Sequence, residues 1–172
     1  MARRDILQLG NPTLRVTCTA VKRNEIVREL IDDLRDTLHS FRAERGFGRG
    51  ISAPQIGITQ RVVVIDTGKP MALINPVVIR RSRKQMTLWD DCFSFPDILA
   101  KVNRSLSIDV RYRDEEGKTI TLRAESGLSE LLQHEIDHLD GILAIDRAVD
   151  SKHIVYRREY ERWIGQQGKV VM

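Results

Sequence analysis

Apolar residues recur every three to four positions between Asn24 and about Glu44, the spacing of an amphipathic helix packed on a core. The stripe consists of Val27, Leu30, Ile31, Leu34, Leu38 and Phe41. Asn24 is placed to cap the first turn. Glycines from Gly46 to Gly50 end the helix. Because glycine and proline break both regular periods, we predict a loop over Gly50 to Gly57.

Short β-branched runs follow this loop and predict strands. They cover Arg61 to Ile65, Ala72 to Ile79 around Pro76, and a hairpin formed by Leu106 to Arg113 and Thr119 to Ala124. The segment from Asp114 to Gly117 has the residues of a hairpin turn. The sequence therefore predicts a mixed, mainly antiparallel sheet.

A second helical stripe runs from Ser126 to Gly141, where glycine suits the C-terminal cap. Its apolar members are Leu128, Leu131, Leu132, Leu139 and Ile142, and the same stripe contains Glu135 and His138. A last helix is predicted from about Ser151 to Ile164, with Ile154, Val155 and Trp163 on its buried side. We expect a solvated tail over residues 165–172.

Length and composition favour one α+β domain over residues 1–172, in which the sheet packs around the helix from Ser126 to Gly141, with an N-terminal amphipathic helix and a C-terminal helix. The 172 residues are 41% apolar, enough for a core without disulfide bonds. Two distant cysteines indicate a reducing compartment. With no signal-like start and no apolar run of membrane-spanning length, we expect a cytoplasmic protein without a membrane partner.

Charge adds little to this picture. The net charge of +4 is spread along the chain, apart from the cluster Arg80, Arg81, Arg83 and Lys84. Only two Trp, three Tyr and four Phe are present, and no nucleic-acid-binding motif is found. A basic surface would at most favour a transient contact with ribosomal RNA.

The strongest chemical signal is the pentapeptide from His134 to His138 on the second predicted helix. Residues four apart lie one above the other on a helix, so both imidazoles can reach one metal ion. Glu135 is rotated to one side, where it can contact a water at the metal without being a ligand. A salt-bridged helix face is the alternative, but burying these groups unpaired would be costly.

A metal needs a third protein ligand, and Cys92 is the leading candidate. It lies in a polar turn between Trp89 and Pro96, and a Cys-His-His set leaves one position open for water. A single cysteine is more often a small core residue, which is how we interpret Cys18.

Three segments, in order, resemble the signature motifs of the peptide deformylase family. They are Gly48 to Gly57 (GRGISAPQIG), Asp90 to Ser94 (DDCFS) and Gln133 to Gly141 (QHEIDHLDG). Similarity extends to Ile6–Pro12 and to Asn75-Pro76, and so covers most of the chain up to about Arg147.

The resemblance implies a metal on Cys92, His134 and His138, most often Fe²⁺, with Zn²⁺, Ni²⁺ or Co²⁺ able to replace it. A metal-bound water would attack the formyl group of N-formylmethionine on nascent polypeptides. Glu135 would transfer the proton. The resemblance further implies that the Gln55 amide and the backbone N–H of Phe93 form an oxyanion hole. Gly50 would pair with the peptide backbone.

The sequence departs from the family in both of the first two motifs. Asp90 and Asp91 replace glutamate and glycine, and Phe93 replaces leucine. Arg104 is the expected partner of Asp90, although the shorter aspartate has less reach. Arg49 replaces an apolar residue, and Ser52 replaces alanine. Arg49 would narrow the peptide cleft, pair with Asp91 or favour an acidic substrate.

These departures leave two alternatives to a deformylase. One is a deformylase-like protein that has an altered substrate preference, or that has lost turnover and acts as a binding module. Intact Glu135 and Gln55 argue against a loss of turnover. The other is a zinc endopeptidase. It is disfavoured because the proposed third ligand is a cysteine upstream of the helix.

Overall fold

The computed structural model describes residues 3–23 and 25–164, so Asn24 and the tail 165–172 lie outside the described residues. The predicted start of the first helix at Asn24 is wrong, because that helix begins at Arg28 with Val27 in the N-cap position. The elements, in chain order, are α1 (Arg28–Arg45), β1 (Gly50–Ser52), β2 (Val62–Asp66), β3 (Pro70–Arg81), β4 (Gln85–Asp91), β5 (Ile98–Ser105), β6 (Ser107–Arg113), β7 (Thr119–Glu125), α2 (Ser126–Leu139), β8 (Ile154–Tyr156) and α3 (Arg157–Glu159).

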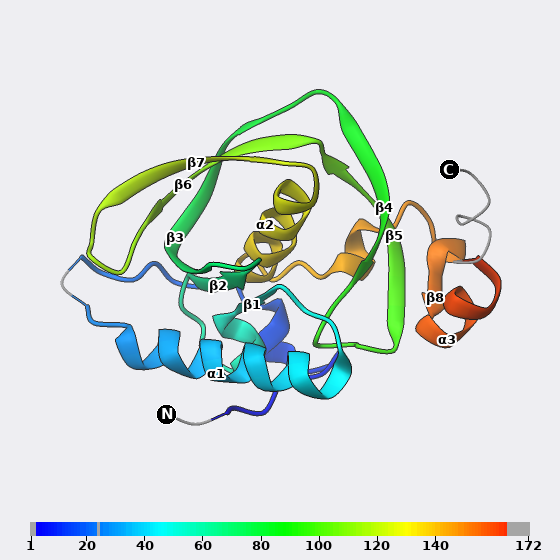
Figure 1. Cartoon of the computed structure of the whole chain (residues 1–172), viewed down its shortest axis with the longest axis horizontal. Helices are drawn as coiled ribbons and strands as arrows, with labels where there is room; N and C mark the ends of the chain where they lie inside the picture. The colour runs from blue at the N-terminus through cyan, green and yellow to red at the C-terminus, as the bar shows by residue number, and fades with distance from the viewer. Residues whose placement is uncertain (1–2, 24, 165–172) are drawn as a thin grey trace.

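Two antiparallel sheets surround α2. One has the order β1-β2-β3-β6-β7 and the other the order β4-β5-β8. Figure 1 places α2 in the middle of the molecule, with β3, β6 and β7 on one side and β4 and β5 on the other. The predicted fold class, a mainly antiparallel sheet around a central helix, is confirmed. In the described part of the chain, the one parallel contact is an isolated bridge between Thr19 and Gln60.

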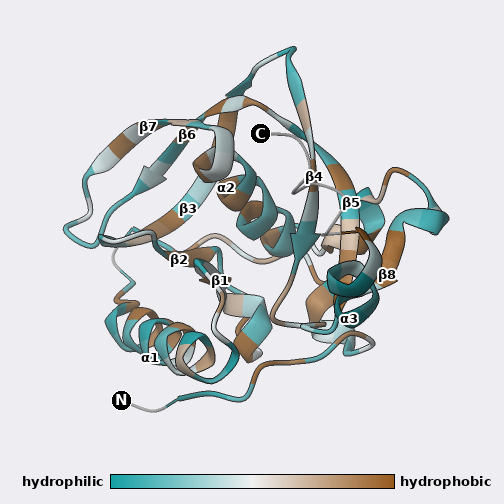
Figure 2. Cartoon of the chain, turned by 45° about the vertical axis from the view of Figure 1, so that its right-hand side comes forward, coloured by the Kyte–Doolittle hydropathy of each residue, from teal (hydrophilic) through white to brown (hydrophobic). Residues whose placement is uncertain are grey.

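Strand β2 shows why the two long helices lie where they do. All five of its residues are buried, and successive side chains point to opposite faces of the sheet. Val62 and Val64 pack with α1 residues such as Leu34, whereas Val63 and Ile65 pack with α2 residues such as Leu132. Figure 2 shows the resulting apolar colouring along β2 and β3. The sheet is therefore covered by a helix on each face.

The predicted loop over Gly50 to Gly57 is wrong in detail. Its first three residues form β1, which pairs with β2 in the register Gly50 to Ile65. The next four, Ala53–Ile56, form a 3₁₀ turn. Glycine and proline lower the propensity for regular structure here, but pairing with the buried strand β2 overrides them.

The predicted helix over Ser151 to Ile164 is also wrong for its first half. Residues Ile154–Tyr156 form β8, which extends the sheet beside β5. A 3₁₀ turn over Ser151–His153 precedes this strand, and α-helical structure begins only at Arg157 and continues as a π-helical turn over Tyr160–Ile164. Ile154 and Trp163 are exposed, not buried. β-branched residues beside the open edge of β5 favour strand pairing over a helix.

The hairpin of β4 and β5 has no counterpart in the sequence prediction. Its polar residues lack strict alternation, and cross-strand contacts such as that between Thr87 Oγ1 and Asn103 Oδ1, at 2.7 Å, hold it together. Over residues 3–23 and 25–164, no helix combines the length and apolar character needed to cross a membrane.

Candidate active site

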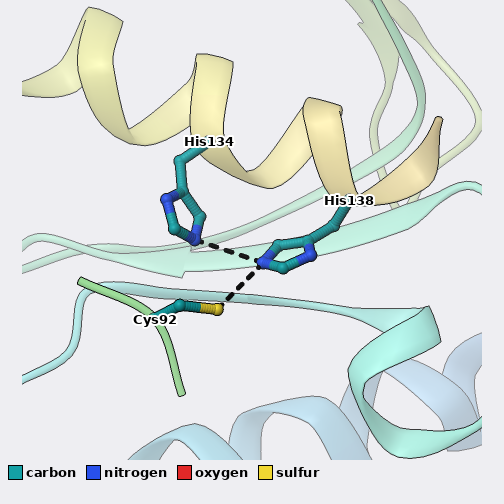
Figure 3. A group of neighbouring side chains, drawn as sticks. All are labelled: Cys92, His134 and His138. Carbon is teal, nitrogen blue, oxygen red and sulfur yellow. Dashed lines mark hydrogen bonds between the residues drawn. The ribbon is translucent and has the colours of Figure 1, made fainter. Parts of the chain in front are cut away.

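The two histidines of α2 and Cys92 bring their side chains to one point. His134 and His138 project from adjacent turns of the helix, and Cys92 follows directly after β4 (Figure 3). His138 Nε2 lies 3.2 Å from both Cys92 Sγ and His134 Nε2. All three residues are buried. The sequence-predicted ligand set therefore meets in space.

The spacing of these three atoms fits a single metal ion. Tetrahedral coordination with ordinary Zn–N and Zn–S bond lengths places ligand atoms about 3.3 to 3.6 Å apart. The three donor atoms all lie within 4.8 Å of one another. Nitrogen and sulfur donors suit zinc or ferrous iron. These three donors could therefore hold a divalent metal ion.

Asp90 supports His134 from behind. Its Oδ1 accepts a hydrogen bond from His134 Nδ1 at 2.8 Å, which turns Nε2 toward Cys92. Burial opposes charge on the His134 ring, but the carboxylate of Asp90 prevails and holds the pKa of His134 well above its usual value. Burial and the charge of His134 hold the pKa of His138 well below its usual value.

A buried guanidinium completes the support. Arg104 is 3% exposed and contacts Asp90 Oδ2 at 3.0 Å. It also pairs with Asp137, which Arg147 reaches from the surface at 2.9 Å. The expected pairing of Arg104 with Asp90 is present, and the shorter aspartate still reaches both Arg104 and His134.

Glu135 lies beside the metal-ligand group and against the backbone of β1. It is 3% exposed, and burial raises the pKa of its carboxyl to about 7. A Cβ atom added to Gly50 would lie 2.7 Å from Glu135 Oε1. Only glycine therefore leaves room at this position for the carboxylate. A carboxyl with a pKa near neutral can both accept and return a proton.

Gln55 is held with its amide nitrogen toward Cys92. The backbone N–H and hydroxyl of Ser52 both donate to Gln55 Oε1, at 2.9 and 3.1 Å. Gln55 Nε2 then lies 3.5 Å from Cys92 Sγ and 3.4 Å from Ser94 Oγ. The 3₁₀ turn thus aims a hydrogen-bond donor at the centre, and the hydroxyl of Ser52 strengthens that orientation.

Several of the residues described above line a cavity of about 600 Å³. Its wall includes Arg49, Gly50, Gln55, Asp90, Asp91, Cys92, Phe93, Glu130, His134 and Glu135. Strand β1 forms one side, and it is an edge strand whose sole strand neighbour within the described residues is β2. Its other edge has backbone groups available to an extended peptide.

Three of the five departures from the family motifs, Arg49, Asp91 and Phe93, have partners that the sequence did not predict. Arg49 Nη2 contacts Glu130 Oε2 at 2.6 Å, so the alternative that Arg49 pairs with Asp91 is wrong. Asp91 instead accepts a hydrogen bond from Arg157 at 2.7 Å. The ring of Phe93 stacks on Phe41, with the ring centroids 3.8 Å apart. Its side chain is therefore part of the core beside the cavity.

Comparison with known proteins identifies the family. The model of the polypeptide deformylase family matches residues 3–153. A peptide deformylase of Rhizobium meliloti is 38% identical over 169 residues, covering 94% of each chain. This chain belongs to the peptide deformylase family.

Solved structures of peptide deformylases share the fold. The crystal structure of the enzyme from Thermotoga maritima has a TM-score of 0.81 at 32% identity, covering 87% of this chain and all of that one. A class I type b peptide deformylase from Acinetobacter baumannii, solved with Met-Ala-Ser bound, has a TM-score of 0.76 at 26% identity. It covers 85% of this chain and 98% of its own. Membership makes the protein a hydrolase of a metal-dependent family.

Sequence reasoning missed Glu130 as a cavity residue of this deformylase. Glu130 precedes His134 by four positions on α2, so helical spacing alone would place it on the same face as the two histidines. Arg157 was also missed. It follows an unpredicted strand, so no local signal marks its contact with Asp91.

Proposed function

We propose that this chain removes the formyl group from the N-terminus of nascent polypeptides that begin with N-formylmethionine, and releases formate. The convergence of Cys92, His134 and His138 beside Glu135 supports the proposal best. Family membership agrees with this reaction, and the buried site can exclude bulk water from the reacting groups.

The donor set fits a divalent cation held by Cys92, His134 and His138. We propose Fe²⁺, with Zn²⁺, Ni²⁺ or Co²⁺ as replacements, because thiolate and imidazole ligands suit all four. Such an ion supplies Lewis acidity and makes hydroxide available near neutral pH.

The residues of the chain account for the remaining steps. Glu135 takes a proton from the attacking water as the oxygen of that water bonds to the formyl carbon. The Gln55 amide and the Phe93 backbone N–H donate to the carbonyl oxygen as it gains negative charge. Glu135 then returns the proton to the nitrogen as the C–N bond breaks. Formate and a free amine leave the site.

The substrate backbone is proposed to extend β1 beside Gly50. The open edge of this strand supports that placement, and the Acinetobacter structure, solved with Met-Ala-Ser bound, is an example of a deformylase that binds a short peptide. Asp91, held by Arg157 at the rim, would contact the peptide beyond its first residue. We propose that the reaction takes place in the cytoplasm, with transient ribosome contact through the basic surface.

The proposal is tested with formyl-Met-Ala-Ser and protein loaded in turn with Fe²⁺, Ni²⁺ and Zn²⁺ under anaerobic conditions. We expect formate release without cleavage of internal peptide bonds. Glu135→Gln should keep the metal and lose about 10²- to 10⁴-fold in kcat, the range for a general acid–base. Cys92→Ser should lose metal.

Three results would contradict the proposal. Absence of formate with every metal would leave only a binding role, and internal cleavage would indicate an endopeptidase. Full activity of Glu135→Gln would rule out the proposed proton transfer.

A further inference from the structure

An ion pair in the wall of the cavity has no part in the proposed hydrolysis. Glu130 is 6% exposed, and its carboxylate is paired with Arg49, whose side chain is 48% exposed. Arg49 also donates to the backbone carbonyl of Gly127 at 3.2 Å. Two charged side chains thus occupy part of the surface that a bound substrate must face.

The pair lies in the same cavity wall as the proposed metal ligands Cys92 and His134. A carboxylate oxygen of Glu130, one of Asp90 and a ring nitrogen of His134 all lie within 4.8 Å of one another. In a formylated peptide, Cβ of the first residue lies about 4 Å or less from the formyl carbon, given ordinary bond lengths. Because Arg49 and Glu130 line the same cavity as Cys92 and His134, a side chain that begins so near the formyl carbon can reach them.

The chemistry of the pair disfavours three kinds of side chain. An apolar side chain would displace water from Arg49 and Glu130 without replacing the hydrogen bonds that the water makes. A cationic one would have to displace Arg49 from Glu130. An anionic one would have to displace Glu130 from Arg49, and it would leave the buried carboxylate of Glu130 without its partner, which argues against the acidic substrate considered from the sequence.

A neutral amide avoids all three costs, because it donates to a carboxylate and accepts from a guanidinium. We infer that this site prefers formylated peptides whose first side chain is a neutral donor and acceptor of the glutamine type over those that begin with methionine. The inference rests on the proposed removal of the formyl group and changes only the preferred first residue, from methionine to a side chain of the glutamine type. Arg49 and Glu130 are its specificity-determining residues.

The test compares kcat/KM for formate release from four peptides, formyl-X-Ala-Ser with X as Gln, Met, Lys or Glu. Gln and Met have side chains of similar length, so the ratio of their kcat/KM values measures the effect of the amide group. We expect formyl-Gln to exceed each of the others by about tenfold or more, since a site built for hydrogen bonds discriminates against a substrate that lacks them.

The double variant R49M/E130L removes both charges together, so no unpaired charge is left buried. It should invert the ratio, with formyl-Met becoming the better substrate. The matched control is R35M/E115L, which removes an ion pair that does not line the cavity. It should leave the ratio unchanged. If R49M/E130L fails to fold, inhibition of the wild-type enzyme by Gln-Ala-Ser and Met-Ala-Ser gives the same comparison.

The outcomes separate the inference from the proposed function. No formate from any peptide would refute the proposed function itself. Formate from all four, with formyl-Met, formyl-Lys or formyl-Glu equal to or better than formyl-Gln, would overturn the inference and leave the function standing. A ratio unaffected by R49M/E130L would overturn the assignment to Arg49 and Glu130.

Discussion

The carboxylate of Glu135 packs against the backbone of Gly50. This contact positions the proposed catalytic group relative to the strand that is proposed to bind the peptide. Gly50 has no positive φ, so the need for glycine here comes from space and not from backbone conformation. The carboxylate fills the place where a side chain would begin. Its position, and hence its reach to a water at the metal, depends on a residue 85 positions away.

Gly50→Ala should therefore impair catalysis more than stability. The added Cβ would meet Glu135 Oε1 at 2.7 Å and displace the carboxylate. We expect kcat for formate release to fall by about tenfold or more, since misplaced catalytic groups cost that much. The free energy of unfolding in urea should change by less than about 1 kcal/mol.

Gly127→Ala is the matched control. Gly127 is the other described glycine without a positive φ, and a Cβ there would make an ordinary contact, 3.5 Å from Arg49 Nη1. Its activity should stay within about twofold of wild type. Equal loss in the two variants would show that the Gly50 contact has no special effect on Glu135.

At the scale of elements, α2 and the β4–β5 hairpin form one structural unit through a buried ion network. Arg104 on β5 lies between Asp90 at the end of β4 and Asp137 on α2. Asp90 in turn holds the His134 ring. The network thus connects the strand that precedes Cys92 to the helix that carries both histidines, and fixes the distance between the proposed ligands.

Arg104→Met should destabilise the protein by about 3 to 5 kcal/mol, because it leaves Asp90 and Asp137 buried without their partner. Arg147→Met is the comparison. Arg147 also pairs with Asp137, but its side chain is 44% exposed, so about 1 kcal/mol or less is expected. Urea unfolding measures both variants. Similar small losses would mean that the buried network contributes little to stability.

At the scale of the whole molecule, the N-terminal segment closes the far side of α2. Cys18 is 5% exposed in the core that α2 shares with the larger sheet. Its backbone N–H donates to the carbonyl of Leu139 at 2.8 Å, at the end of the helix. The expectation that Cys18 is a core residue is confirmed. Burial raises the pKa of its thiol from 9.0 to about 11, with Arg61 partly opposing the shift.

This thiol makes stability depend on alkaline pH. Below about pH 9, both states keep the proton, and the native preference for the neutral thiol has its full effect. Between about pH 9 and pH 11, the unfolded chain loses the proton while the native protein keeps it, so stability falls as pH rises. Cys18→Ala should show a smaller decrease in unfolding free energy between pH 8 and pH 10.5. Parallel curves for the two proteins would contradict the prediction.

Local features of the chain determined the central part of the site. His134, Glu135 and His138 lie on one helical turn and a half, so their relative positions follow from helix geometry alone. The stripes of α1 and α2 and the β6–β7 hairpin were likewise readable, because each depends on residues close in sequence. Cys92 was inferred from the need of a metal for a third ligand, and Gln55 from the resemblance to family motifs, which carry information about contacts that periodicity cannot supply.

Contacts between segments that are distant in sequence determined the parts of the fold and the site that the sequence did not predict. β1 and β8 form because an open strand edge is available to them, and β4–β5 is held by cross-strand pairs that have no local signal. Arg49 had three plausible roles in the sequence. Only the packing of β1 against α2 joined it to Glu130, because the partner of a charged side chain depends on which segments the fold brings together.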